Sequence, residues 1–277
     1  MNLYQIQNYL FSPLTWMFMI YGLFIGSFLN VCIYRIPRKI FWQKHRSHCT
    51  SCDALIPFWN NIPVFSWLLL RGRAACCGEK ISSIYPIVEL LTGAIFVISY
   101  WCFPFLAESS YGYTVDSGML IRFAHALLFS CILIVCSFID RELQIIPDVI
   151  SIPMIVISPL VAWLHPDLTL RASLIGVFVG GGLFYFVAWS YFMLRGEAGL
   201  GFGDVKLLAA IGGWLGYQSI LPTVFLGSII GAMIGIGVII ITSSYDTKLK
   251  LPFGPFLSIG ALCHLYFGQV LMEFLYS

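Results

Sequence analysis

Charged residues are scarce in this chain of 277 residues, in which Asp, Glu, Lys and Arg together make up 10%. A soluble domain carries roughly 25% charged residues, so this composition excludes an ordinary soluble protein. Hydrophobic residues make up 59% of the chain, and the mean hydropathy is +0.89. The sequence therefore predicts an integral membrane protein.

Several motifs with a defined chemistry are missing from the sequence. It has no G-x-G-x-x-G, no G-x-x-x-x-G-K-[ST] and no H-E-x-x-H, so dinucleotide, P-loop and HExxH-type zinc protease functions are unsupported. It has no basic face with interleaved aromatic residues, which argues against a nucleic acid partner. The first apolar segment has no basic stretch before it and no A-x-A-like site after it. This pattern predicts an uncleaved anchor rather than a signal peptide.

Apolar segments fill most of the chain, and a spanning helix needs about 20 such residues. We identify eight segments, of which the sixth is short for a full span and could be tilted or re-entrant. We therefore predict an all-α polytopic membrane protein with about eight transmembrane helices and a small cytoplasmic subdomain that contains cysteines. The segments are 14–35, 85–106, 119–139, 145–164, 171–194, 205–217, 220–242 and 252–275.

The basic residues predict the orientation of these segments. With the N-terminus outside, 13 of the 15 Lys and Arg residues fall in cytoplasmic loops, and only Arg122 and Arg171 fall outside. The positive-inside rule predicts such a bias. The same arrangement puts Asp140, Asp148 and Asp204 at the cytoplasmic ends of their segments.

Two aspartates are the strongest catalytic candidates. Asp204 lies in Gly199-Leu200-Gly201-Phe202-Gly203-Asp204-Val205-Lys206, next to residues that are almost all apolar or glycine. A carboxylate beside hydrocarbon is costly and is usually retained for function. Asp140 ends another apolar segment on the same predicted side. Neighbouring carboxylates can share one proton, so that one takes a proton from water while the other polarises a peptide carbonyl.

Two alternatives weaken this pairing. Each aspartate could be a solvated helix end, beside Arg141 and Lys206 respectively. Asp148 also competes with Asp140 as the partner of Asp204. Asp148 follows Pro147, however, and this pattern is typical of a helix start, where Asp complements the helix dipole. We therefore prefer Asp140.

The hydrophilic segment at roughly 36–84 carries four of the nine cysteines. Cys49-x-x-Cys52 followed by Cys76-Cys77 is similar to a zinc site with four thiolates. Ala74 stands where a second C-x-x-C pair would have its first cysteine, and Cys76 could supply the fourth thiolate instead. If no metal binds, these are free thiols, because a cytoplasmic loop is reducing.

Three other polar residues have more than one interpretation. His45 or His48 could replace a cysteine as the fourth metal ligand, since imidazole also binds zinc. Glu89 lies near the start of the second apolar segment, where an acidic residue is a functional candidate. It could also simply pair with Arg35 or Lys80.

The order and spacing of these motifs resemble the type IV prepilin peptidases, which are leader peptidases with N-methyltransferase activity and belong to the GxGD aspartyl proteases. The resemblance covers nearly the whole chain. The matching segments are Gly26 to Pro37, Cys49 to Cys52, Asn61-Ile62-Pro63, Ser66-Trp67, Arg71-Gly72-Arg73, Ile81-Ser82, Tyr85 to Leu90, Phe138-Ile139-Asp140, Ile146-Pro147-Asp148, Gly201 to Lys206 and Pro252 to Phe256.

The resemblance implies a bifunctional enzyme of the bacterial inner membrane. It would cut the leader from type IV prepilins and pseudopilins at the cytoplasmic border, with Asp140 and Asp204 as the catalytic pair. It would then methylate the new N-terminus with S-adenosylmethionine, for which the sequence shows no binding motif. It also implies a first anchor at 1–36, a methyltransferase-associated cysteine loop at 37–84 and a peptidase domain at 85–277.

Two other functions could use the same carboxylates. Intramembrane proteases of the presenilin type share the Gly-x-Gly-Asp motif but lack a comparable cysteine loop beside the first span. A proton-coupled transporter needs polar residues along a path across the bilayer. Here the acidic groups gather on one predicted side, which favours a peptidase.

Overall fold

The computed structural model describes residues 12–40, 47–49, 51–109, 112–196, 201–242 and 252–276. The chain divides into two compact units, Met1–Phe123 and Ala124–Ser277. The three-part division at residues 36 and 84 stays a prediction. Some residues used in the sequence analysis lie outside the described ranges, namely Lys44, His45, Arg46, Gly199, Leu200, Lys248 and Lys250.

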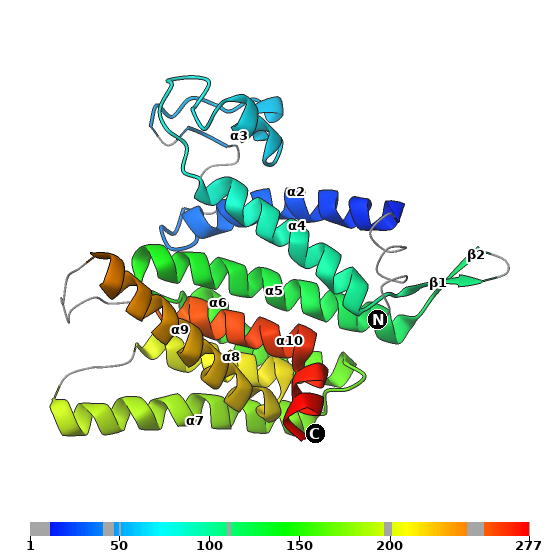
Figure 1. Ribbon diagram of the computed structural model, residues 1–277, viewed down its shortest axis with the longest axis vertical. Coiled ribbons are helices and arrows are strands. Elements are labelled where there is room, and N and C mark those ends of the chain that lie inside the picture. Colours follow the sequence, from blue (N-terminus) through cyan, green and yellow to red (C-terminus); the bar gives the residue numbers. More distant parts are fainter. Residues whose placement is uncertain are drawn as a thin grey trace. The chain divides into compact units, whose positions relative to one another are not determined.

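Two helices, α2 (Pro13–Arg35) and α4 (Ile84–Cys102), pack along each other in the first unit (Figure 1). Proline suits the first turn of α2, because its fixed φ is helical and the N–H that it lacks would have no helical partner. Glycine allows the two backbones to meet: a Cβ atom on Gly26 would lie 2.6 Å from the Cα of Glu89. This contact holds the loop between the helices close to one end of the pair.

The chain between α2 and α4 forms only short elements within the described residues, η1 (Phe58–Asn61) and α3 (Phe65–Leu69). Within this loop, the indole N–H of Trp67 donates to the carbonyl of Ile81 at 3.2 Å. Beside it, the amide of Asn30 on α2 donates to the carbonyl of Tyr85 on α4 at 3.0 Å and joins the two helices. In the structure, the cysteine loop refers to the described residues 47–49 and 51–83 of this segment.

A short β-hairpin follows α4, and the other regular elements among the described residues are helices. Strands β1 (Leu106–Ser109) and β2 (Gly112–Val115) pair antiparallel, with Leu106 opposite Val115. The aromatic side chain of Phe105, just before β1, lies 4.9 Å from that of Phe123 between ring centroids. The hairpin therefore folds back beside the start of α5 (Ser117–Leu143), which continues into the second unit.

The second unit is built around α8 (Phe202–Leu215), a helix of 14 residues that packs against α6, α7 and α10. Its side chains from Val205 to Trp214 are almost all buried, and they form a hydrophobic core with residues of the neighbouring helices. That core includes Phe129, Leu133, Leu207, Leu208, Ile211 and Leu257. The remaining elements are α6 (Asp148–Leu164), α7 (Leu170–Arg195), η2 (Tyr217–Ser219), α9 (Ile220–Thr242) and α10 (Gly254–Tyr276).

Local signals set the ends of these helices. The Thr169 hydroxyl caps α7 by accepting the N–H of Ala172 at 3.2 Å, and Gly196 ends the helix in the left-handed conformation with φ +71°. Pro147 is extended and Asp148 is the first residue of α6, which confirms the helix start predicted from the sequence.

Each of the eight predicted apolar segments overlaps a helix, although 85–106 runs past the end of α4 into β1. Among the described residues, five helices are long and apolar enough to cross a membrane: α2, α4, α5, α7 and Tyr217–Ile240. Helix α6, with 17 residues, and α8 are shorter. Large apolar side chains such as Trp163 and Phe178 are mostly exposed, as expected where lipid covers the surface. The chain is therefore a helical, multi-pass membrane protein, and the number of eight spans stays a prediction.

Candidate functional site

Asp140 lies near the C-terminal end of α5 and is 6% exposed. Its Oδ2 atom accepts the backbone N–H of Gly254 at 3.0 Å. Gly254 is the first residue of α10, and the free N–H groups of a helix start favour a carboxylate. A Cβ atom on Gly254 would lie 2.7 Å from the same oxygen, so a larger residue would displace the carboxylate.

Asp204 lies in the first turn of α8, after the extended Gly201. Its backbone N–H donates to the carbonyl of Gly201 at 3.1 Å, which closes this turn. Gly203 brings the turn against another segment, because a Cβ atom there would lie 3.1 Å from the Cβ of Ile146. Gly203 therefore lets the first turn of α8, next to Asp204, pack closely against Ile146.

Ile146 connects the surroundings of the two aspartates. Its side chain lies against Gly203 on one side and near Gly254 on the other, where a Cβ atom would lie 3.3 Å from its Cδ1. The carboxyl groups of Asp140 and Asp204 are close enough to interact electrostatically. The structure thus brings together, within the second unit, the two carboxylates that the sequence singled out.

Asp148 has a different environment. It is exposed, and its carboxylate accepts a hydrogen bond of 2.5 Å from the ammonium group of Lys206. This ion pair joins the start of α6 to the first turn of α8, two residues after Asp204. Lys206 therefore has Asp148 as its partner, and Asp148 acts as a helix start and ion-pair partner.

Glu89 anchors the cysteine loop to α4 in the first unit. Its buried carboxylate accepts the backbone N–H of Val64 at 2.7 Å and also bonds the hydroxyl of Ser27. Val64 has φ +60°, a strained conformation for a β-branched residue that needs support from its surroundings. The partners of Glu89 are thus a backbone amide and a hydroxyl, rather than the cations suggested by the sequence.

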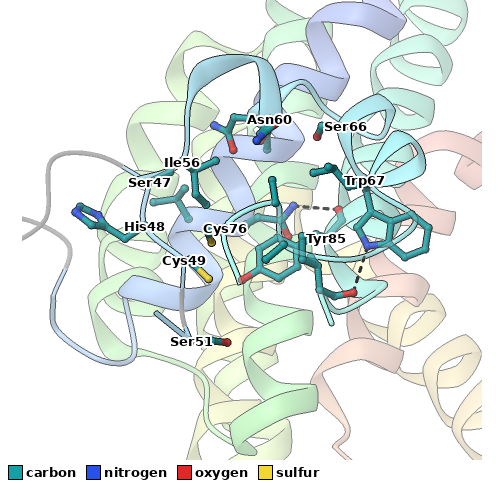
Figure 2. Close-up of a pocket in the computed structure, with 18 of the residues that line it drawn as sticks. Ser47, His48, Cys49, Ser51, Ile56, Asn60, Ser66, Trp67, Cys76 and Tyr85 are labelled. Carbon is teal, nitrogen blue, oxygen red and sulfur yellow. Dashed lines mark hydrogen bonds between the residues drawn. The ribbon is translucent and has the colours of Figure 1, made fainter. Parts of the chain in front are cut away.

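A cavity of about 530 Å³ lies beside this anchor (Figure 2). Its walls come from the end of α2, the cysteine loop and the start of α4. Asn60, Trp67 and Tyr85 line it together with two of the cysteines, Cys49 and Cys76.

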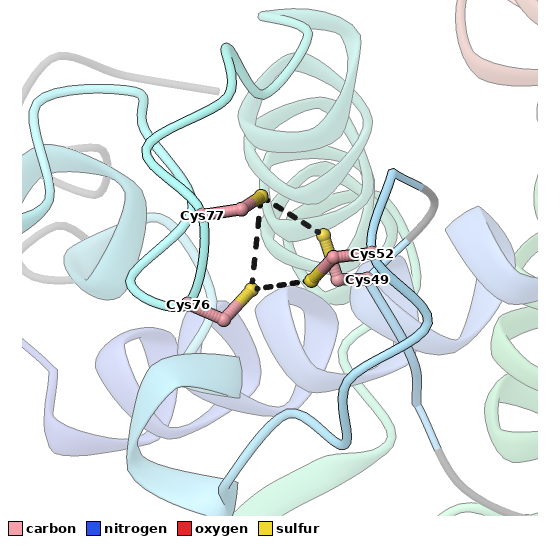
Figure 3. Close-up of side chains that lie close together, drawn as sticks. All are labelled: Cys49, Cys52, Cys76 and Cys77. Atoms are coloured by element: carbon pink, nitrogen blue, oxygen red, sulfur yellow. Dashed lines mark hydrogen bonds between the residues drawn. The ribbon is translucent and has the colours of Figure 1, made fainter.

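The side chains of Cys49, Cys52, Cys76 and Cys77 converge at one point (Figure 3). Their four sulfur atoms all lie within 4.8 Å of one another. The Sγ atoms are 3.7 Å apart for Cys49 and Cys77, and 3.3 Å apart for Cys52 and Cys76. Tetrahedral zinc with bonds of about 2.3 Å would separate its sulfur ligands by roughly 3.8 Å. The cluster therefore has a suitable geometry for a metal ion. Cys76 supplies the fourth sulfur atom, which a cysteine at position 74 would supply in a regular C-x-x-C pair.

The thiols of this cluster differ in acidity. The backbone N–H groups of Ser51 and Cys52 bond the Cys49 sulfur and lower its pKa to about 6. The hydrogen bonds of Cys76 with Cys52 and Cys49 raise its pKa to about 12. Four thiolates this close repel one another, and a divalent cation removes that repulsion because its ligands bind deprotonated.

Sequence reasoning missed the part played by Gly254 and the presence of the cavity. Gly254 lies 114 residues from Asp140 in the chain. A glycine between Phe253 and Pro255, at the start of an apolar segment, was the only local signal. The cavity is formed by residues from three separate segments, so no single motif reports it.

Comparison with known proteins adds independent findings. Residues 20–103 match the Bacterial Peptidase A24 N-terminal domain, and residues 127–236 match the Type IV leader peptidase family. The prepilin leader peptidase/N-methyltransferase of Xanthomonas campestris pv. campestris is 33% identical, with 91% of each chain covered. The protein of the same name from Aeromonas hydrophila is 33% identical over 90% of this chain and 89% of its own.

A third relative, the type 4 prepilin-like proteins leader peptide-processing enzyme of Escherichia coli O78:H11, is 38% identical over 88% of this chain and 91% of its own. No solved structure matches the chain. Asp140 and Asp204 lie within the second matched region, and the four clustered cysteines lie within the first. The chain belongs to the type IV leader peptidase family.

Proposed function

We propose that this chain removes the leader peptide from type IV prepilins and pseudopilins and then methylates the new N-terminus. Membership of the leader peptidase family supports the first activity, and the names of the relatives support both. The observation that carries the proposal is the proximity of Asp140 and Asp204, which come from different helices and interact electrostatically around Ile146.

In the proposed reaction the two carboxyl groups share one proton and hold a water molecule. The ionised group takes a proton from this water while the water oxygen attacks the carbonyl carbon of the scissile peptide. The protonated group donates to the carbonyl oxygen, which gives a tetrahedral intermediate. A proton then passes to the amide nitrogen, the C–N bond breaks and the leader leaves.

The residues around the pair have supporting roles in this proposal. The N–H of Gly254 holds one oxygen of Asp140 in place, which fixes the direction of its carboxylate. The ion pair between Lys206 and Asp148 holds the turn that carries Asp204 against the start of α6. Positioning of this kind is a large part of catalysis, because small displacements of reacting groups cost much of the rate.

The location of the reaction follows from the charge distribution. The predicted eight-span arrangement gives 13 of the 15 basic residues to one side, and by the positive-inside rule this supports a position of both aspartates at the cytoplasmic border of the inner membrane. Water reaches a carboxylate there more easily than in the hydrocarbon core. The apolar helix of a prepilin could remain in the bilayer while its leader enters the site from the cytoplasm.

We assign the cysteine cluster to a structural zinc ion held by Cys49, Cys52, Cys76 and Cys77. A closed set of four thiolates leaves no open position for a substrate, which is typical of a structural rather than a catalytic zinc site. When bound, the ion would cross-link the two halves of the cysteine loop. S-adenosylmethionine would supply the methyl group for the second reaction.

The test uses the purified protein in detergent with a synthetic prepilin and S-adenosylmethionine that carries a labelled methyl group. Leader loss is followed by mass, and label on the product is measured separately. We expect both. Cleavage without label would leave a peptidase alone. Ion flux in proteoliposomes without any cleavage would contradict the proposal and favour a transporter.

A further inference from the structure

Large apolar side chains are exposed on η1 and α3, the two short helices of the cysteine loop. Their exposed fractions run from 39% for Ile62 to 78% for Phe58. A loop surrounded only by water rarely leaves so many apolar groups uncovered, and such a surface marks a site of interaction with a protein or a membrane. We refer to these six side chains as the apolar patch: Phe58, Trp59, Ile62, Phe65, Leu68 and Leu69.

The apolar patch belongs to a folded surface. On α3, Trp67 and Leu70 line the cavity, whereas Phe65, Leu68 and Leu69 are 57 to 67% exposed. The two adjacent aromatic rings of η1 pack against each other with 4.8 Å between their centroids, and η1 contacts α3. The helix α3 therefore has one side that faces the cavity and another that lacks a protein partner among the described residues.

The start of α3 is anchored well inside the ends of the helix pair α2–α4. The N–H of Val64, directly before α3, donates to Glu89, which also bonds Ser27. Glu89 lies five residues after the start of α4, and Ser27 lies eight residues before the end of α2. At a rise of about 1.5 Å per residue, α3 begins roughly 8 to 12 Å inside these ends, beside the pair (Figure 1). Both helices are long and apolar enough to cross a membrane, so α3 lies at a level where lipid surrounds the pair.

The helix surface next to this anchor is also apolar and exposed. Phe28 follows Ser27 on α2, and Leu90 follows Glu89 on α4, and both side chains are exposed. Exposed apolar side chains on a membrane-spanning helix face lipid. The anchor of the loop is thus bordered by lipid-facing residues, and the apolar patch adds a surface of the same kind.

Basic residues follow the apolar patch in the sequence. Residues 36–83 contain seven Lys and Arg residues and two acidic residues, a net charge of +5. The proposed zinc ion with four thiolates subtracts two charges, which leaves +3. Arg71, Arg73 and Lys80 are all exposed just after α3. An apolar surface that contains tryptophan and is followed by basic residues is typical of segments that lie in the interface of an anionic membrane.

We propose that η1 and α3 insert the apolar patch into the lipid leaflet on the side of the cysteine loop, where the basic residues after α3 bind anionic head groups. The partner is therefore an anionic phospholipid surface. A protein partner would require neither the level of α3 beside the spanning helices nor the basic residues that follow it. Insertion holds the cysteine loop against the membrane independently of the peptidase and methyltransferase activities.

The first experiment uses the wild-type protein. Purified full-length chain is reconstituted into vesicles of phosphatidylcholine and phosphatidylglycerol that contain a trace of phospholipid with a photoactivatable group near its head group. After irradiation, the peptides that carry lipid are identified by mass spectrometry. We expect label on peptides from residues 57–70 and on α4 peptides around Leu90, which are the positive control. Label on α4 without label on residues 57–70 would overturn the proposal.

The second experiment compares two double variants that lose the same two leucines. Leu68→Asp with Leu69→Asp places carboxylates in the leaflet, so we expect the lipid label on residues 57–70 to fall by about tenfold. Leu68→Lys with Leu69→Lys keeps apolar stems in the lipid and brings ammonium groups to the anionic head groups. This variant should retain most of the label. Equal loss in both variants, with the α4 label unchanged, would overturn an anionic membrane surface as the partner.

The third experiment tests the basic residues and the competing occupants. Arg71→Gln with Arg73→Gln should lower the wild-type preference for vesicles with phosphatidylglycerol over vesicles of phosphatidylcholine alone. An unchanged preference would overturn the role of these residues. A prepilin with its own photoactivatable group tests the other occupant. Label from this prepilin on residues 57–70 in the absence of label from lipid would overturn the proposal and indicate a substrate-docking surface.

Discussion

The backbone N–H of Gly254 donates a hydrogen bond of 3.0 Å to the Oδ2 atom of Asp140. It joins the first residue of α10 to the end of α5, and it leaves no room for a Cβ atom at position 254. Because Asp140 is buried, this contact controls where its carboxylate points. A site that depends on two carboxylates meeting is sensitive to such a contact.

We therefore expect Gly254→Ala to lower leader removal by about ten- to a hundredfold, because small displacements of a catalytic group are costly. The matched control is Gly237→Ala on α9, where an added Cβ atom meets no other group within 4 Å. Initial rates of cleavage at saturating prepilin measure the effect. Equal rates in the two variants would show that the position of Asp140 does not depend on Gly254.

The two aspartates themselves should be required for cleavage. Asp140→Asn and Asp204→Asn each remove a group that must exchange a proton, so we expect each to reduce cleavage by about a hundred- to ten-thousandfold. Asp148→Asn is the matched control, since this residue is exposed and pairs with Lys206. An exposed ion pair contributes about 1 kcal/mol or less, so the loss of its positioning effect on Asp204 should lower cleavage by less than about tenfold. Full cleavage by either of the first two would remove that residue from the mechanism.

The sequence predicted the local features of this protein well. Long apolar runs give helices because their backbone must bond internally in lipid, and each of the eight predicted segments overlaps a helix. Pro147 and Asp148 marked a helix start for local reasons. Asp140 and Asp204 stood out because a carboxylate at such a position is costly.

Contacts between residues far apart in the sequence could not be predicted from local sequence patterns. Nothing near Asp140 in the sequence indicates that Gly254 binds it, and nothing near Glu89 indicates that its carboxylate binds Val64. The hairpin formed by Leu106–Ser109 and Gly112–Val115 was missed because strand pairing depends on the partner strand. The cysteine spacing left the fourth ligand open, since the approach of Cys76 depends on how the loop folds.

The cysteine cluster leads to a prediction about metal content. We expect about one zinc ion for each purified chain, and Cys52→Ser should lower this content because it removes one of four ligands. Cys102→Ser is the control, since this residue is exposed and lies outside the cluster. The cluster lies in the region that matches the N-terminal family domain and outside the region that matches the peptidase family, so Cys52→Ser should reduce methylation more than leader removal. Elemental analysis and the two activity assays measure these effects.

Acid should release the same metal. Zinc binds thiolates, so protons compete with it, and the apparent affinity falls as the pH is lowered. Zinc content after dialysis at a series of pH values should therefore decrease towards acid pH in the wild-type protein. A zinc content that stays constant at every pH would contradict binding of the ion by thiolates. Equal loss of leader removal and methylation on zinc removal would contradict a structural ion confined to the first unit.

Glu89 provides the last prediction, because its carboxylate holds the strained Val64 turn. Glu89→Leu leaves the N–H of Val64 without its acceptor, and we expect amide hydrogen exchange over residues 62–67 to accelerate by about tenfold. Glu89→Gln keeps an acceptor oxygen at the same place and should protect these amides much better. Mass spectrometry of deuterated peptides measures the difference. Equal exchange in the two variants would mean that the loop is held by its other contacts, among them the bond from Trp67 to Ile81.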